Sequence, residues 1–298
     1  MKRFAIISDS SCDLDKEKRE KYDIDYIPMR ILFDDKDYPA SLDYEQVGYK
    51  EFFDLLRNGT RIKTAQINVN VYYDKFEEII KGGEDVLYVA CSSGLSNSYK
   101  SSLIAKEEIL QKYPDAKIEV VDTLNGCLGV GLLAVTASLL REQGKTIEEA
   151  RDYLEQHKME MNQIGSVENL IYLKRAGRVS MASAFFGGLL QFKPIIISDI
   201  NGMNTAVEKV KGRKKSFERM VEMFKELYVK NPIYDKLHIT NADCPDDAEL
   251  LKSMIHEANP EIEIEIEKMG PIIGASTGPG MIAIYFYGKE VTFDGNKK

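Results

Sequence analysis

The sequence contains few cysteines and histidines, and it has no excess of positive charge. Its 298 residues include three histidines, and the acidic residues outnumber the basic ones by 48 to 40, giving a net charge of −8. The four cysteines, Cys12, Cys91, Cys127 and Cys244, form no CxxC pair, which argues against a disulfide framework and a zinc site. Reduced thiols suit a cytoplasmic protein. An acidic surface disfavours nucleic acid and membrane surfaces as partners.

Long apolar segments are also missing. The longest one, residues 127–140, is shorter than the roughly 20 residues that a bilayer span requires. The N-terminal residues run straight into a short strand-like segment, without the apolar core of a signal peptide. We therefore expect no transmembrane segment and no stable association with a membrane.

Several catalytic and metal-binding motifs are absent. No Walker loop occurs, and neither the HExxH nor the EF-hand spacing of metal ligands is present. Residues 274–278 fit GxSxG by letter, but a predicted strand follows where a nucleophile elbow requires a helix. The histidines lie on predicted helices or inside a predicted strand, so no serine has an evident base. We predict no catalytic residue and no metal site.

The most informative stretch is residues 86–101, an apolar run followed by serines. The run from Val86 to Ala90 indicates a strand buried on both faces, as in a parallel sheet. A serine-rich turn then opens an amphipathic helix. This arrangement predicts free backbone N–H groups and the positive end of a helix dipole at the carboxyl edge of the sheet. We therefore favour a small anionic ligand here over serines that merely cap a helix.

The same pattern of an apolar strand followed by short polar side chains occurs at two further strands. The three strand ends carry Asp9, Ser93 and Asp122, and we expect them to line one edge of the sheet. The two carboxylates could share a cation, but we favour ordinary caps. Strand and helix alternate throughout residues 1–160, which predicts a three-layer α/β/α domain with a mostly parallel sheet.

The pattern changes in the second half, where we predict a further α/β domain over residues 161–298, with a mixed sheet, closing over the ligand. The Asn-Gly pair at 201–202 is a strong hairpin signal. Residues 261–267 alternate Glu and Ile, which predicts a half-buried strand whose glutamates face water. The basic run at 209–215 is either a solvated face or a docking site for an acidic partner or a phosphate group.

Other segments are expected to shape the site. We predict a polar loop at 63–68, a helix at 182–190 and a Gly-rich loop at 274–280. The apolar helix near 127–140 must be buried. This helix and residues 185–190, with methionines such as Met269 and Met281, could line a dry channel behind the anion site.

Five short motifs are spread along nearly the whole chain. They are Thr64-Ala65-Gln66, Ser92 to Tyr99, Leu173 to Ser180, Lys193-Pro194-Ile195 and Gly278-Pro279-Gly280. In order and spacing these motifs resemble those of the DegV family of bacterial fatty-acid-binding proteins, and the ordered set is more specific than any one motif.

The resemblance implies a two-domain carrier that holds one long-chain fatty acid between its domains, with no cofactor and no catalysis of its own. A partner fatty-acid kinase would then convert the bound acid into an acyl phosphate for phospholipid synthesis. By motif, Thr64 and Ser96 would hydrogen-bond the carboxylate, with Ser93 nearby. Arg178 would lie near the carboxylate or the kinase-facing surface. The expected ligand-binding set is Thr64, Ser93, Ser96, Arg178, Ser276 and Thr277.

Three positions depart from the family's pattern. Ala65 stands where the family commonly has Ser, and Asn97 stands where it usually has Gly, although Asn tolerates unusual backbone angles. Ser276 stands where the family usually has His. If that histidine assists phosphoryl transfer, this chain would bind lipid without serving the kinase in the same way.

Two other functions compete with the carrier hypothesis. One is a small-molecule transferase or hydrolase that uses a strand-end serine, although the missing base counts against it. The other is a small-anion sensor whose partner reads domain closure, which the absence of an apolar cavity behind the serine turn would favour.

Overall fold

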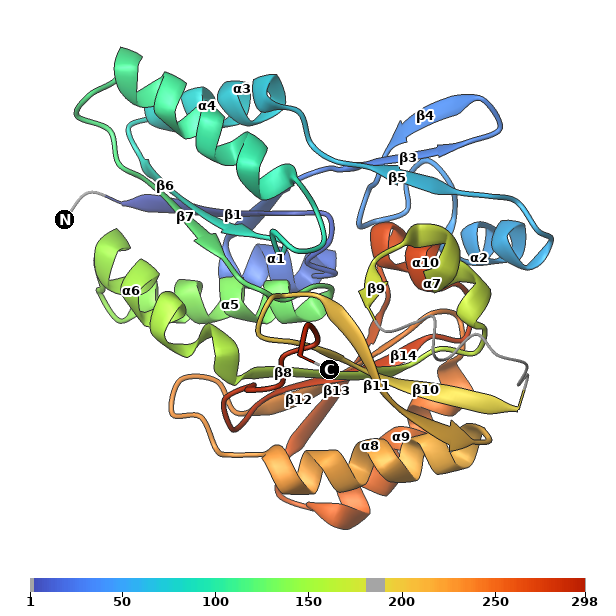
Figure 1. The fold of residues 1–298 in the computed structure, drawn as a ribbon. Coiled ribbons are helices and arrows are strands. Elements are labelled where there is room, and N and C mark those ends of the chain that lie inside the picture. Colours follow the sequence, from blue (N-terminus) through green and yellow to red (C-terminus); the bar gives the residue numbers. More distant parts are fainter. Residues whose placement is uncertain (1–2, 181–190, 298) are drawn as a thin grey trace.

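The computed structural model describes residues 3–180 and 191–297 and shows two sheets with helices between and outside them (Figure 1). Sheet A has the parallel strand order β2-β1-β6-β7. Its strands are β1 (Phe4–Asp9), β2 (Ile24–Ile27), β6 (Asp85–Ala90) and β7 (Ile118–Asp122). All six residues of β6 are buried, which explains why its sequence is an apolar run without alternation.

Helices cover both faces of sheet A, so the three-layer prediction is confirmed (Figure 1). On one face lie α3 (Val69–Lys81) and α4 (Ser98–Lys112). On the other lie α1 (Lys16–Tyr22), α5 (Leu128–Glu142) and α6 (Ile147–His157). The last of these begins at a capping box of Thr146 and Glu149.

Sheet C is mixed, with the order β13-β12-β14-β8-β10-β11-β9. The β12–β13 and β9–β11 pairs are parallel and the others antiparallel. Its strands are β8 (Met161–Ser166), β9 (Val179–Ser180), β10 (Phe192–Ser198), β11 (Asn204–Lys211), β12 (Lys236–Asn241), β13 (Glu263–Lys268) and β14 (Ile282–Tyr287). Helices α8 (Arg213–Leu227) and α9 (Pro245–Ala258) cover its outer face, while α5 packs between the sheets (Figure 1).

The chain is thus an α/β protein of two domains, one on each sheet. A 3-10 helix, η1 (Lys158–Glu160), leads from α6 into β8. The exact division at residues 160 and 161 stays a prediction. The predicted hairpin is confirmed, because β10 and β11 pair across a turn in which Gly202 has a φ of +68°. The helix expected at 182–190 lies outside the described residues.

A small antiparallel sheet B, with the order β4-β3-β5, lies beside the junction of the domains. Its strands are β3 (Arg30–Phe33), β4 (Lys36–Pro39) and β5 (Lys63–Ala65), and its neighbours are α2 (Tyr49–Arg57), α7 (Leu170–Ala176) and α10 (Pro271–Thr277). The loop expected at 63–68 is therefore partly a strand, because Thr64 pairs in register with Ile31.

The Gly-rich loop expected at 274–280 is also wrong in part. Helix α10 starts with Pro271 in its first turn, where proline is favoured, and continues to Thr277. Gly274 serves packing rather than a turn, since a Cβ there would lie 2.9 Å from Cζ of Phe53 on α2. Close helix packing and a flexible loop use the same small residues.

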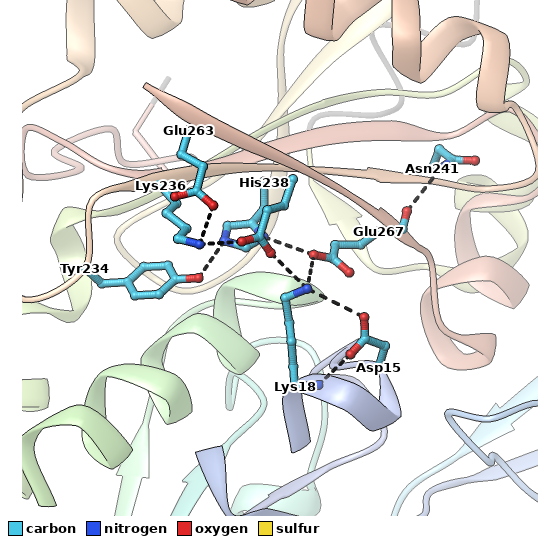
Figure 2. A network of polar contacts seen from close by, with 9 residues as sticks. Asp15, Lys18, Tyr234, Lys236, His238, Asn241, Glu263 and Glu267 are labelled. Carbon is cyan, nitrogen blue, oxygen red and sulfur yellow. Dashed lines mark hydrogen bonds and ion pairs between the residues drawn. The ribbon is translucent and has the colours of Figure 1, made fainter. Parts of the chain in front are cut away.

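A buried polar cluster joins the two domains on one side of the molecule (Figure 2). Lys18 of α1 reaches β13, where its Nζ lies 2.6 Å from Glu267 and 2.9 Å from Glu265. His238 of β12 adds a contact of 3.2 Å from Nδ1 to Glu267, and its Nε2 lies 2.8 Å from the Tyr234 hydroxyl. We call these five residues the Lys18 network.

The Lys18 network corrects the expectation that the glutamates of this strand simply face water. Glu267 is only 5 % exposed. Burial alone would raise the pKa of Glu267, but His238 and Lys18 lower it below its ordinary value. Burial would likewise raise the pKa of Glu265. Hydrogen bonds from Lys236 and Lys18 outweigh this effect and lower the pKa to about 2. Glu265 and Glu267 therefore connect one domain to the other, whereas Glu263 is exposed as expected.

Candidate ligand-binding site

A cavity of about 310 Å³ lies between the carboxyl edge of sheet A, sheet B, and helices α7 and α10. This volume is at the lower end of the roughly 300–1,000 Å³ typical of small-molecule sites. The cavity, which we call the main cavity, brings together all six predicted ligand-binding residues. They are Thr64, Ser93, Ser96, Arg178, Ser276 and Thr277.

The strand ends of sheet A meet at this edge as predicted, and their carboxylates bind backbone amides of the neighbouring loops. Asp9 is fully buried and accepts hydrogen bonds from the Ser11 amide at 2.9 Å and the Cys91 amide at 3.1 Å. Asp122 accepts one from the Ser93 amide at 3.1 Å. Neither carboxylate is a helix cap, since Asp15 caps α1 and Asn97 precedes α4, and the preference against a shared cation stays a prediction.

The serine turn after β6 does not offer the free amides that the sequence predicted. The amide of Gly94 donates to Oγ of Ser92 at 3.1 Å. Those of Leu95 and Ser96 donate to the Ser92 carbonyl at 3.0 and 3.1 Å. Since the Ser93 amide is bound to Asp122, the amides of residues 93–96 are all occupied, and the donors left for an anion are side chains and the N-terminus of α4, which has no side-chain cap.

Two hydroxyls in the main cavity have no hydrogen-bond partner among the described residues, namely those of Thr64 and Ser93. The other three candidates use their hydroxyl protons locally. Ser96 donates to Ser98 Oγ at 2.9 Å, Ser276 to the Ile272 carbonyl at 3.1 Å, and Thr277 to the Ile273 carbonyl at 2.8 Å. Thr64 and Ser93 are therefore the hydroxyls best able to donate to an anion.

Arg178 reaches the main cavity from the opposite domain. It follows Gly177, whose φ of +65° ends helix α7 in the left-handed conformation. Its Nη1 donates to the Ala176 carbonyl at 2.7 Å and its Nε to the Leu95 carbonyl at 3.4 Å. No carboxylate among the described residues pairs with this guanidinium, so its charge is available to a ligand.

The larger apolar side chains of the lining come partly from the predicted motifs and partly from segments that the sequence did not single out. Leu95 and Leu173 belong to two of the motifs, whereas Met29, Ile272 and Ile273 were not predicted. The expectation that helix 127–140 and the two methionines line the channel is wrong for the described cavity, because α5 is buried between the sheets. Residues 185–190 lie outside the described residues.

Two further details bear on the chemistry. Asn97 has a φ of −75°, an ordinary angle, so this turn does not need the tolerance of Asn for left-handed backbone. None of the described residues that line the main cavity is a histidine. Ser93 therefore has no neighbouring base of the kind a nucleophilic serine requires.

The fold and cavity define a two-domain α/β protein with a site of hydroxyls and one arginine at the domain junction. The chain belongs to the DegV family, since the family model described as uncharacterised protein, DegV family, matches residues 3–289. A DegV domain-containing protein of Clostridium perfringens is 40% identical over 288 residues, which cover 97% of this chain and 98% of that protein.

Solved structures of the family share the whole fold. A DegV lipid-binding protein from Thermotoga maritima is 29% identical with a TM-score of 0.82, covering 97% of this chain and 100% of that one. A DegV family protein from Thermus thermophilus, described for its fatty-acid binding, is 25% identical with a TM-score of 0.85, covering 96% and 100%. Among the described residues, no helix has the length and apolar character needed to cross a bilayer.

Proposed function

We propose that this protein binds one long-chain fatty acid, with the carboxylate at Thr64 and Ser93 and the acyl chain against the apolar wall of the main cavity. The observation that carries the proposal is that two hydroxyls, which have no hydrogen-bond partner in the described part of the chain, line one cavity together with large apolar side chains. Arg178, from the other domain, supplies the compensating charge. An amphipathic ligand with an anionic head matches a cavity that has polar groups at one place and an apolar wall at another.

The energetics agree with such a ligand. Each buried methylene contributes about 0.8 kcal/mol, so the acyl chain provides most of the affinity. A hydrogen bond to a charged group contributes roughly 1.5–3 kcal/mol, enough for two hydroxyls to orient the head. Relatives described as binding fatty acid or lipid support the same ligand class here.

We further propose that the protein is a non-catalytic carrier in the cytoplasm that presents the acid to a fatty-acid kinase. The absence of a histidine from the described lining supports a carrier rather than a hydrolase. The exposure of Arg178 supports presentation, because a partner can reach this side of the cavity. Ser276, which replaces the family's usual histidine, also lines the main cavity.

Native mass spectrometry of the freshly purified protein, followed by extraction, tests the ligand class. We expect about one fatty acid per chain. Thr64→Val with Ser93→Ala should weaken palmitate binding at least roughly tenfold. Ser102→Ala is the matched control, since its hydroxyl donates to the Tyr99 carbonyl on α4. A protein that carries no lipid and ignores added palmitate would refute the proposal and favour a small-anion sensor.

Phosphorylation tests the kinase partnership separately. We expect the palmitate-loaded protein to support acyl phosphate formation by a fatty-acid kinase with ATP, and Ser276→His to change the rate. Because Ser276 lines the main cavity, the palmitate affinity of both forms is measured and the rates are compared at equal palmitate occupancy. If neither form supports the reaction while both bind palmitate, the carrier proposal stands and the kinase proposal fails.

A further inference from the structure

A second cavity, of about 230 Å³, adjoins the main cavity. The two share Thr64, Arg178 and Ser276, so the predicted carboxylate position lies on their common wall. The remaining lining comes from α2, β5, α7 and α10 and the segment between the first two. A group attached to a carboxylate at Thr64 would therefore point into this second cavity.

The lining of the second cavity is cationic. It contains Arg61, Lys63, Arg175 and Arg178, and no Asp or Glu is among its lining residues. None of the four forms an ion pair within the described part of the chain, although acidic residues outnumber basic ones in this protein. Arg61 and Lys63 also line another cavity together with aspartates of the β3–β4 hairpin, but no ion pair joins them to these aspartates within the described part of the chain.

All four side chains are exposed, so solvent screens their mutual repulsion, but four neighbouring cations that form no ion pair among the described residues still make this cavity attractive to an anion. Three of the four are arginines, whose planar forks match phosphate oxygens bidentately. A fatty-acid carboxylate at Thr64 and Ser93 needs only one of these charges, that of Arg178. The surplus charge lies on the side of Thr64 that the acyl chain does not occupy.

We propose that this cationic cavity is a phosphate subsite. It would hold a phosphate dianion next to the bound carboxylate, either the phosphate of an acyl phosphate or the terminal phosphate of its nucleotide donor. In that reaction a carboxylate oxygen bonds to the terminal phosphorus of a kinase-bound nucleoside triphosphate, and the nucleoside diphosphate leaves with the electrons of the broken P–O bond. This inference rests on the proposed function for its source of phosphate.

Binding measurements on the full chain test the subsite. The probes are palmitate and 2-oxoheptadecylphosphonate, in which a methylene replaces the bridging oxygen of palmitoyl phosphate. We expect the wild type to prefer the phosphonate roughly tenfold at low salt, because several charge contacts act together. Raising the salt concentration should reduce this preference.

The variant Arg61→Gln, Lys63→Gln, Arg175→Gln should lose the preference and keep its palmitate affinity, since Thr64, Ser93 and Arg178 are untouched. The matched control neutralises three exposed lysines of α8, Lys214, Lys215 and Lys225, and should keep the preference. No preference in the wild type, or equal loss in both triple variants, would overturn the subsite.

Two further arms separate the phosphate sources and the dependence on the proposed function. If ATP binds the wild type without the kinase and the cavity variant fails to bind it, the donor's phosphate occupies the subsite. If only the phosphonate shows the effect, the acyl phosphate does. If palmitate does not bind at all, the binding of inorganic phosphate tests the subsite. Phosphate that binds the wild type but not the cavity variant supports the subsite, and phosphate that does not bind the wild type refutes it.

Discussion

The two domains meet at two polar regions, which differ in whether their charged side chains are paired. In the Lys18 network, Glu265 and Glu267 share the Lys18 ammonium at 2.9 and 2.6 Å. Around the cavities, the hydroxyls of Thr64 and Ser93 and four cationic side chains lack such partners among the described residues. The charges of the first region are paired within the described chain, whereas those of the second are left for the anionic ligand that we propose.

This difference shows that a cluster of charged side chains is not by itself evidence of a ligand site. His238, Glu265 and Glu267 bring possible metal-ligand atoms within 4.8 Å of one another. The Lys18 ammonium already lies between those carboxylates, so their geometry serves domain attachment (Figure 2). A charged cluster indicates a ligand site only where its own chain leaves the charge unpaired.

Removing Lys18 should have the largest effect. In Lys18→Met, two acidic side chains, one of them buried, lose their shared cation. Breaking a buried ion pair costs about 3 to 5 kcal/mol, and we expect the lower value because Lys18 is 15% exposed. Urea unfolding at pH 7 measures it. Lys16→Met is the control, since its ion pair is exposed and should contribute less than about 1 kcal/mol.

The same variant should flatten the dependence of stability on acid pH. The pKa of Glu265 is about 2 in the folded protein against an ordinary 4.5. A carboxylate with a lowered pKa adds stability that is present above pH 4.5 and lost as the pH falls toward 2. The deficit of Lys18→Met should therefore shrink as the pH is lowered. A deficit that stays constant between pH 7 and 3 would contradict this role.

Asp13 provides the opposite case, a buried carboxyl that has no ionic partner among the described residues. Burial raises its pKa to about 7, and Cys127 Sγ lies 2.8 Å from its Oδ2. A raised carboxyl pKa means that stability falls as the pH rises from about 4 to 7. Asp13→Asn should remove this slope and gain about 2 kcal/mol at pH 8 relative to pH 5. Asn also suits the φ of +52° at this position. Equal effects at both pH values would be the contrary result.

Ser92 and Ser93 offer the finest test, because adjacent serines should act differently. Ser92 is fully buried and donates to the Gly202 carbonyl at 2.7 Å. Its Oγ also accepts from the Gly94 amide, so Ser92→Ala should cost about 2 kcal/mol of stability, the usual contribution of two hydrogen bonds. Ser93→Ala should leave thermal unfolding unchanged and weaken palmitate binding. If both variants changed thermal unfolding, or both changed palmitate binding, the distinction between the two serines would be wrong.

Local patterns predicted the parts of the fold that depend on local physics. The buried strand β6, the capping box of α6 and the Asn-Gly hairpin each carry their signal within a few consecutive residues. Strand β5 carries no such local signal, because its three residues form a strand only through their pairing with β3. Helix α10 was missed because Gly274 is required by the distant Phe53.

The site shows the same limit. All six predicted residues line one cavity, yet the turn amides were wrongly taken as free, since Asp122 lies 29 positions from Ser93. The second cavity could not be inferred either, because Arg61 and Arg175 are far apart along the chain. Which polar groups remain unpaired is a property of the folded chain.

The contact between the serine turn and the β10–β11 hairpin has a consequence for mutational tolerance. A Cβ on Gly94 would lie 2.7 Å from the Asn201 carbonyl oxygen, and one on Gly202 would collide with Ser92. Both glycines should therefore tolerate no other residue in a saturation library selected for function. Their intolerance would arise from backbone contact between the domains, so a substitution map alone would mark Gly202 as a ligand residue although it does not line the main cavity.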